Sequence, residues 1–197
     1  MKLGVFLLPN GELNSQIIKW KRIIAEKIPD QPYTLHPPHL TLISLDIDNY
    51  DSVIRDVLRL SKYFSPFELN INKTDVFWND SFTNGHTLFY GLKKNVNLYK
   101  LQKHVANILI NYKKDNNKNI KMDSKVFEKS YKKYGSPFIG EHWIPHFSIS
   151  SIQGSEKHSV IDRFLSTDVE LSCMIDKITT WEINSDNHKQ LDEFPLK

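Results

Sequence analysis

Cysteine is nearly absent from this chain of 197 residues, which holds only Cys173. A single cysteine excludes an internal disulfide, so the sequence predicts a protein that works in a reducing compartment such as the cytoplasm. The thiol lies within the apolar stretch VELSCMI. We therefore expect Cys173 to be a buried, unreactive side chain rather than a nucleophile.

Long apolar runs are also missing. No stretch of the chain approaches the roughly 20 apolar residues that span a membrane. The apolar segment KLGVFLL near the N-terminus stops at Pro9 and is too short for the apolar region of a signal peptide. These absences predict a protein without a membrane partner, and no feature of the sequence points to an obligate protein partner.

Neither sign of charge is in large excess, since the net charge is +3. This is a weak preference for anionic partners and does not by itself indicate nucleic acid. The lysines gather in one polar segment, at about residues 113–140, which we expect to be a long loop with about one helical turn. They are Lys113, Lys114, Lys118, Lys121, Lys125, Lys129, Lys132 and Lys133. Two interpretations stay open: a solvated, flexible loop, or a loop that steers an oligonucleotide by its charge.

The length and the ordinary share of hydrophobic residues, 40%, fit one domain over residues 1–197. Short apolar or alternating segments predict strands, and longer segments with helical spacing predict helices. The expected strands are 2–8, 38–47, 66–78, 85–92, 142–152 and 169–184. The expected helices are 13–28, 50–64, 97–112 and 155–166, with a turn at 79–85 and an unstructured tail over the last ten residues. This order is typical of an α+β protein with two sheets or lobes.

Two short motifs share the pattern histidine, apolar, hydroxyl, apolar. HLTL begins at His39, and HFSI begins at His146, 107 residues later. Each motif follows a proline and opens a predicted strand. Because side chains alternate between the two faces of a strand, Thr41 shares a face with the first histidine and Ser148 with the second.

Two imidazoles and two hydroxyls that face each other across a cleft suit phosphodiester chemistry. Imidazole titrates near pH 6.5, so at neutral pH one ring can take a proton while the other gives one. The hydroxyls of Thr41 and Ser148 can donate hydrogen bonds to the phosphoryl oxygens, where negative charge grows during the reaction. Such a site needs neither a metal nor another cofactor.

A metal site is the weaker interpretation of these histidines. His36 precedes His39 by three residues and His142 precedes His146 by four, and zinc ligands have similar spacings. Those spacings serve on helices or around cysteines, and the prolines inside both segments exclude a helix. We therefore expect no metal.

Four aromatic side chains are candidates for stacking a nucleobase: Trp78, Phe89, Tyr90 and Trp143. Packing in the core or at the rim of the site is the other interpretation of each. Trp143 is the strongest stacking candidate because it stands three residues before His146.

The paired motifs resemble those of the 2H phosphoesterase superfamily, which includes bacterial 2'-5' RNA ligase-like proteins, cyclic nucleotide phosphodiesterases and viral 2',5'-phosphodiesterases. The likeness runs from KLGVFLLP to TTWEIN, and HWIPHFSIS is especially similar to the viral and cellular 2',5'-phosphodiesterases. The resemblance implies a bilobal, pseudo-symmetric α+β fold, in which two mainly antiparallel sheets flank a central groove and helices lie outside. It also implies that His39 and His146 are the acid–base pair and that Thr41 and Ser148 bind the phosphate. Ser148 stands where threonine is usual but keeps the hydroxyl donor, and the lysine-rich segment has no counterpart in the family pattern.

Chemistry and resemblance together predict a metal-independent phosphodiesterase that acts on RNA-type linkages, with 2'-5'-linked oligonucleotides of the oligoadenylate type favoured. Substrates with a 2',3'-cyclic phosphate, and cyclic oligonucleotide signals, stay open. A hypothesis of another class is an RNA-end or nucleotide-binding module without turnover. Which histidine is the base also stays open, because pseudo-symmetry makes the two roles exchangeable.

Overall fold

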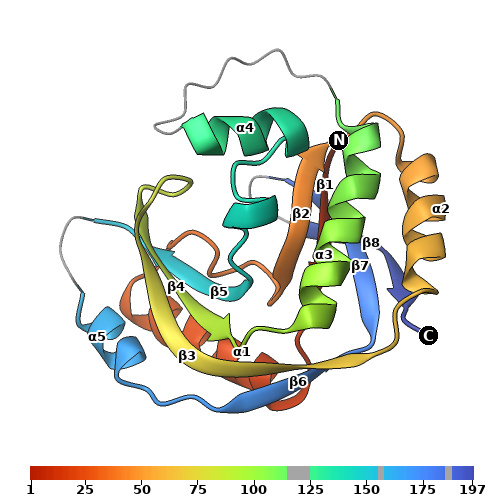
Figure 1. Cartoon of the computed structure of the whole chain (residues 1–197). Coiled ribbons are helices and arrows are strands. Elements are labelled where there is room, and N and C mark those ends of the chain that lie inside the picture. The colour runs from red at the N-terminus through yellow and green to blue at the C-terminus, as the bar shows by residue number, and fades with distance from the viewer. Residues whose placement is uncertain (115–124, 155–157, 185–187) are drawn as a thin grey trace.

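Eight strands and five α-helices make up the part of the chain that the computed structural model describes, which is residues 1–114, 125–154, 158–184 and 188–197 (Figure 1). In chain order the elements are β1 (Lys2–Leu7), α1 (Gly11–Lys27), β2 (Leu40–Asp46), α2 (Tyr50–Ser61), β3 (Phe67–Asp80), β4 (Gly85–Leu92), α3 (Val96–Leu109), the 3-10 helix η1 (Ile110–Tyr112), α4 (Lys125–Tyr134), the 3-10 helix η2 (Gly140–His142), β5 (His146–Ile152), α5 (Ser159–Leu165), β6 (Leu171–Ile175), β7 (Lys177–Ile183) and β8 (His188–Pro195). None of the helices in these ranges has the length and apolarity that crossing a membrane requires.

The strands form one antiparallel sheet in the order β6-β3-β4-β5-β2-β1-β7-β8. In the middle of the sheet, β2 and β5 are in register at one residue pair, Leu40 with Phe147. The two predicted sheets are therefore two four-stranded halves that share a narrow junction. We call β2-β1-β7-β8 lobe A and β5-β4-β3-β6 lobe B. The α+β class is confirmed.

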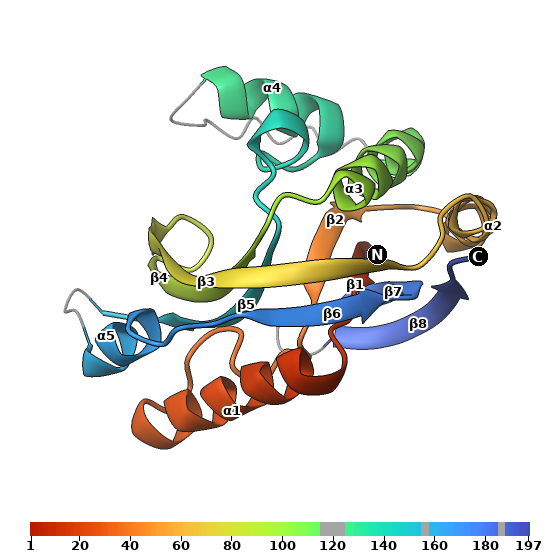
Figure 2. The same ribbon diagram turned by 60° about the horizontal axis from the view of Figure 1, so that its bottom comes forward.

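The helices cover the two lobes from outside. α1 packs against β5 and β6 of lobe B, while α3 packs against β2 of lobe A and against α2. Figure 2 shows α1 and α5 beneath the strands of lobe B and the pair α2 and α3 beside lobe A. Helical spacing of apolar residues explains the contact of α1, which buries Leu13, Ile17, Trp20 and Ile24.

A shared irregularity supports a pseudo-twofold relation between the lobes. In lobe A the β1–β2 ladder has a bulge at Leu42, and in lobe B the β4–β5 ladder has a bulge at Ile149. Each bulged residue directly follows the hydroxyl residue of its motif. β-Bulges increase the local twist and re-aim side chains, and they are frequent next to active sites.

The single strand predicted at residues 169–184 is wrong. It is two strands, β6 and β7, separated at Asp176, whose carbonyl accepts a hydrogen bond from the backbone N–H of Leu196 (2.7 Å). β6 pairs with β3 at the edge of lobe B, whereas β7 pairs with β1 in lobe A. Both halves have strand-like sequences, so the pattern did not reveal that the stretch crosses from one lobe to the other.

The unstructured tail predicted for the last ten residues is also wrong. The first eight of them form β8, which pairs with β7 along its length. β8 is an edge strand, where polar and charged side chains can stay in water, so its sequence HKQLDEFP has weak alternation. Phe194 in β8 and Leu196 just after it are buried in the core.

The lysine-rich segment contains a ten-residue helix, α4, where about one helical turn was predicted. Phe127, Tyr131 and Tyr134 recur at spacings of four and three residues and give α4 one aromatic face. The intervening lysines obscured this pattern. Residues 115–124, which include two of the predicted loop lysines, lie outside the described residues, as do residues 155–157 of the predicted helix at 155–166.

Two smaller predictions are confirmed. The β3–β4 connection is a tight turn, with Asn84 at a positive φ of 56°. Cys173 is a buried free thiol, and its sulfur accepts a hydrogen bond from the backbone N–H of Asn10 (3.3 Å).

Candidate active site

The two motifs meet at the junction between the lobes. Leu40 and Phe147, the paired residues of the junction, are fully buried in the core. Because side chains alternate along a strand, the neighbours of this pair point to the other face of the sheet. These neighbours are His39, Thr41, His146 and Ser148, and all four are partly exposed. We call the face that carries them the motif face.

The strand register sets the four side chains on both sides of one backbone pair. Continuing the pairing of Leu40 with Phe147 by one residue sets Thr41 across from His146, and His39 across from Ser148. Residues directly across an antiparallel pair have Cβ atoms about 5 Å apart, and diagonal neighbours lie about 7–8 Å apart. The two imidazoles are such a diagonal pair. A phosphate between them can touch both rings and both hydroxyls.

Each motif histidine is oriented by the same backbone contact. Nδ1 of His39 lies 2.7 Å from the carbonyl oxygen of Pro37, and Nδ1 of His146 lies 2.7 Å from that of Ile144. A carbonyl can only accept, so Nδ1 carries the hydrogen and the neutral ring presents Nε2 as an acceptor. In both motifs a proline stands between the carbonyl and the histidine, and its fixed φ holds the geometry. This explains why each histidine follows a proline.

Aromatic side chains enclose both imidazoles. The ring of His39 stacks on Phe6, with ring centroids 4.0 Å apart and planes 20° apart. The ring of His146 makes edge-type contacts with Phe77 and Phe89, with ring centroids 4.9 and 5.2 Å apart. These apolar neighbours remove water from the rings and so disfavour their charged form.

Burial lowers the pKa of both motif histidines. The pKa of His39 falls from 6.5 to about 3, chiefly through burial, with the positive charge of nearby His188 and Lys21 acting in the same direction against the hydrogen bond to Pro37. Burial also lowers the pKa of His146, against the hydrogen bond to its backbone carbonyl partner. Both rings are therefore neutral at pH 7 in the free protein.

His188 is a neighbour of the first motif that the sequence analysis missed. It comes from β8, and its ring centroid lies 5.8 Å from that of His39, 4.1 Å from that of His36 and 6.1 Å from that of Phe6. Three imidazoles thus gather on the lobe A side of the motif face. No spacing in the sequence links residue 188 to the first motif, because β8 is joined to β2 only through β7 and β1 of the sheet.

Lys21 is a second residue that the sequence analysis missed, and it binds backbone carbonyls next to the second motif. It is 7% exposed, and its ammonium group donates hydrogen bonds to the carbonyls of Tyr33 and Ile149 (2.8 Å for the latter). Ser150 adds a hydroxyl contact with Thr34 at 2.7 Å. These bonds tie the segment between α1 and β2 to β5. Burial lowers the pKa of Lys21 to about 7.

Trp143 lies beside the site but is mostly covered. It is 8% exposed, its indole N–H donates to the carbonyl of Thr41 (3.1 Å), and Tyr99 packs against it with ring centroids 5.5 Å apart. Little ring surface remains for a nucleobase. The structure therefore favours the packing role for Trp143, and base stacking by it stays a prediction.

The other aromatic candidates divide between core and rim. Phe89 and Tyr90 are buried, whereas Trp78 is 48% exposed. Near the turn that follows β3, exposed Phe82 contacts Phe138 with ring centroids 5.4 Å apart. This contact joins the β3–β4 turn to the segment that precedes the second motif.

Lysines around α4 make mostly local contacts. Lys113 donates to the carbonyl of Lys132 (2.9 Å), Lys132 pairs with Glu128 (2.6 Å), and Lys133 lies over the ring of Tyr134.

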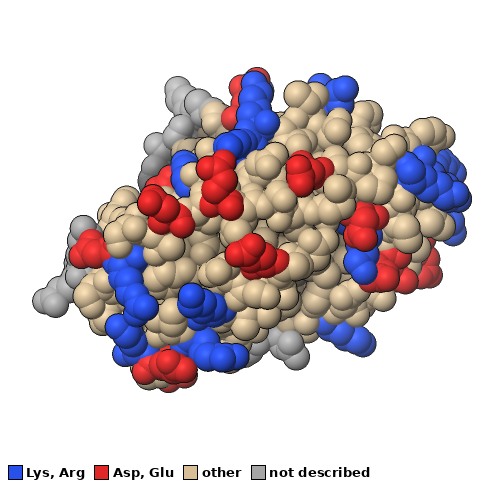
Figure 3. Space-filling view, turned by 90° about the horizontal axis from the view of Figure 1, so that it is seen from below, with Lys and Arg blue, Asp and Glu red and all other residues tan. Residues whose placement is uncertain are grey.

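Figure 3, which views the molecule from below, shows basic and acidic side chains interspersed on that face. Among the described residues, no group of three or more His, Cys, Asp or Glu side chains is arranged to hold a metal ion.

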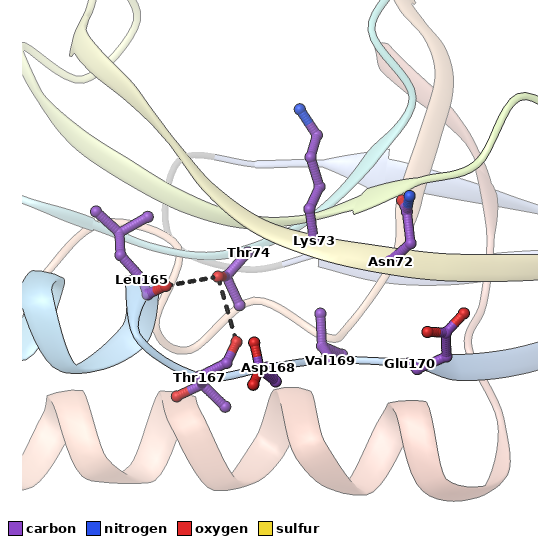
Figure 4. Close-up of a pocket in the computed structure, with 8 residues that line it drawn as sticks. All are labelled: Asn72, Lys73, Thr74, Leu165, Thr167, Asp168, Val169 and Glu170. Atoms are coloured by element: carbon purple, nitrogen blue, oxygen red, sulfur yellow. Dashed lines mark hydrogen bonds between the residues drawn. The ribbon is translucent and has the colours of Figure 1, made fainter.

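A surface depression of about 610 Å³ lies on the opposite face of lobe B from the motifs (Figure 4). Its lining residues are Asn72, Lys73, Thr74, Leu165, Thr167, Asp168, Val169 and Glu170. The hydroxyl of Thr74 donates there to the carbonyls of Leu165 and Thr167, at 3.4 and 3.5 Å. Lys73, one residue earlier on β3, is in register with His146 through β4, so Thr74 and this depression belong to the outer face.

Residues 10–187 match the family model of the 2'-5' RNA ligase superfamily. The chain belongs to this superfamily. The predicted 2H phosphoesterase relationship is thereby confirmed. The superfamily match ends just before β8 begins.

The chain is also similar to individual proteins in sequence or in fold. A protein of Halalkalibacterium halodurans with a provisional phosphoesterase designation is 31% identical over 104 residues, so the chain spans about half the length of this curated relative (51% of the chain and 56% of the relative). The crystal structure of TT0787 of Thermus thermophilus has a TM-score of 0.70 at 13% identity and covers 100% of this chain and 98% of that one. E. coli LigT complexed with 3'-AMP has a TM-score of 0.60 at 12% identity, with the same coverage. At these identities the structural likeness shows the fold.

Proposed function

We propose that this protein is a metal-independent phosphodiesterase that cleaves RNA-type linkages with His39 and His146 as its acid–base pair. The supporting observation is their placement. The two rings flank one junction, and each is held through Nδ1 by a backbone carbonyl. Their Nε2 atoms are then the groups that can exchange protons with one phosphate.

The reaction follows from this geometry. With a 2'-5' linkage, one neutral imidazole takes the proton of the free 3'-hydroxyl, whose oxygen then attacks phosphorus. The bond from phosphorus to the 5'-oxygen breaks, and the other imidazole, protonated, gives its proton to that oxygen. The products are a 2',3'-cyclic phosphate and a 5'-hydroxyl. Thr41 and Ser148 donate to the non-bridging oxygens, where negative charge increases.

Binding of the anionic substrate favours the protonated form of one imidazole. Burial keeps both rings neutral in the free protein, which suits the base but leaves the acid without its proton. A phosphate anion beside the rings favours the charged form and raises their pKa values. The active protonation state is then reached on binding, when one imidazole takes up a proton from the solvent.

We favour 2'-5'-linked oligonucleotides, of the oligoadenylate type, as substrates. Membership of the 2'-5' RNA ligase superfamily supports a ribonucleotide linkage. E. coli LigT, which has a similar fold, has been crystallised with 3'-AMP. A 2',3'-cyclic phosphate fits the same machinery with water as the attacking group. A cytoplasmic place of action is part of the proposal, supported by the buried, reduced thiol of Cys173.

A substrate panel tests this function. Purified protein is incubated, with EDTA present, with 2'-5' oligoadenylate, 3'-5' RNA and 2',3'-cyclic nucleotides, and the products are resolved by chromatography. We expect cleavage of the 2'-5' substrate to a 2',3'-cyclic phosphate, and loss of that product in His39→Ala and His146→Ala. Tight binding of these ligands without any product would overturn the proposal in favour of a nucleotide-binding module.

A further inference from the structure

Three residues form a row across lobe B that begins at the second motif. His146 of β5 pairs with Gly91 of β4, and Gly91 pairs with Lys73 of β3. Directly paired residues of antiparallel strands point to the same face. Lys73 therefore stands on the motif face with His146, two strand spacings or roughly 10 Å away between Cα atoms.

Gly91 has no side chain, so the Lys73 side chain can occupy the space above it, between Lys73 and His146 in the row. A Cβ atom at Gly91 would lie 2.8 Å from Cγ and 2.6 Å from Cε of Lys73. The aliphatic part of Lys73 thus extends from β3 over Gly91 of β4. Figure 4 shows that Lys73 and Thr74 leave β3 on opposite sides, with Thr74 pointing into the outer depression and Lys73 pointing away from it.

Asp75 holds the ammonium group in this position. Nζ of Lys73 donates to Oδ2 of Asp75 at 2.7 Å, and the two side chains are 54% and 42% exposed. Asp75 is the next residue of β3 on the motif face, in the row that continues through Phe89 to Ser148. An ammonium group has three donors, so Lys73 can bond an anion while it keeps Asp75.

We propose that Lys73 binds the phosphate next to the scissile one, on the lobe B side, and so selects substrates with at least two phosphates. The inference rests on the proposed function, since it needs a scissile phosphate between His39 and His146. A phosphate there leaves Lys73 about one nucleotide away. The preferred substrate is then an oligonucleotide with a neighbouring phosphate rather than a 2',3'-cyclic mononucleotide, which has no second phosphate.

Three substrates test the proposal: 2'-5' diadenosine monophosphate, the same compound with a 5'-terminal phosphate, and the same compound with a phosphate on its other end. For wild type, we expect one of the two added phosphates to raise kcat/KM about 10-fold or more, which is the scale of one charge-assisted hydrogen bond. Lys73→Met keeps the aliphatic chain over Gly91 and should abolish that gain while it leaves cleavage of the monophosphate unchanged. Lys73→Arg should restore much of the gain.

Lys19→Met is the matched control, since it removes the same charge from the exposed face of α1, the helix that covers the outer side of lobe B. A phosphate preference that persists in Lys73→Met, or an equal loss on all three substrates, would overturn the role of Lys73. If wild type cleaves none of the three, the proposed function itself fails, and the inference fails with it.

Discussion

Leu40 and Phe147 are backbone partners at the junction of the two lobes, and both side chains are fully buried. This one pair sets the distance between two motifs that stand 107 residues apart in the sequence. The motif histidines immediately precede the two partners, so they share the motif face at a diagonal spacing. The predictions below follow from that placement and from the charges around it.

Replacing His39 or His146 by alanine should lower turnover by about 100-fold or more, the scale of a lost general acid or base. Single-turnover cleavage of 2'-5' diadenylate measures the effect. His104→Ala, on the exposed surface of α3, is the control and should keep wild-type activity. Full activity in either motif variant would rule out the acid–base pair.

Replacing Thr41 by valine, or Ser148 by alanine, should lower kcat by about 100-fold, because each loses a donor to the charge that grows on phosphate. The exchanges Thr41→Ser and Ser148→Thr keep the hydroxyl and should stay within a few-fold of wild type. If kcat fell equally in the variants that lose the hydroxyl and in those that keep it, the shape of the side chain rather than its hydroxyl would be what matters.

The pH optimum of kcat/KM should lie below 6.5. The reaction needs one neutral and one protonated imidazole, and that form is most abundant between the two pKa values of the free protein. Burial lowers both values, that of His39 to about 3, so the maximum moves towards acid. A profile between pH 4 and pH 9, measured with EDTA, tests this, and a maximum above pH 7.5 would contradict it.

His188→Gln should raise the pKa of His39. In wild type, positive charge on His188 disfavours protonation of His39, whose ring centroid lies 5.8 Å away. Removing that charge makes protonation easier, so the acid side of the kcat/KM profile should move to higher pH. NMR titration of the His39 ring measures the shift directly. An unchanged His39 titration would show that β8 has no electrostatic effect on the site.

Lys21→Met should flatten the pH dependence of stability. Burial lowers the pKa of Lys21 from 10.5 to about 7 in the folded protein. Between these values the unfolded chain binds more protons, so this lysine makes the free energy of unfolding rise with pH. Urea unfolding at several values between pH 7 and 9.5 should show a smaller rise in the variant than in wild type. Lys19→Met, an exposed control on the same helix, should keep the wild-type slope.

Much of the site was predictable because its causes are local. Alternation along a strand puts His39 with Thr41 and His146 with Ser148, whatever the rest of the chain does. The helix α1 was predictable because its apolar residues recur at every turn and form one face. The aromatic face of α4 was missed because lysines fill the positions between.

The sequence by itself determined which side chains could do the chemistry and which face of its own strand each one takes, since these depend on neighbours a few residues apart. Only the tertiary structure decided which strands lie side by side. That choice split residues 169–184 between the two lobes, brought β8 and His188 beside the first motif, and aligned Lys73 with His146 across Gly91. Its physical basis is burial and backbone pairing between segments far apart in the chain, which leave no periodic trace in the sequence.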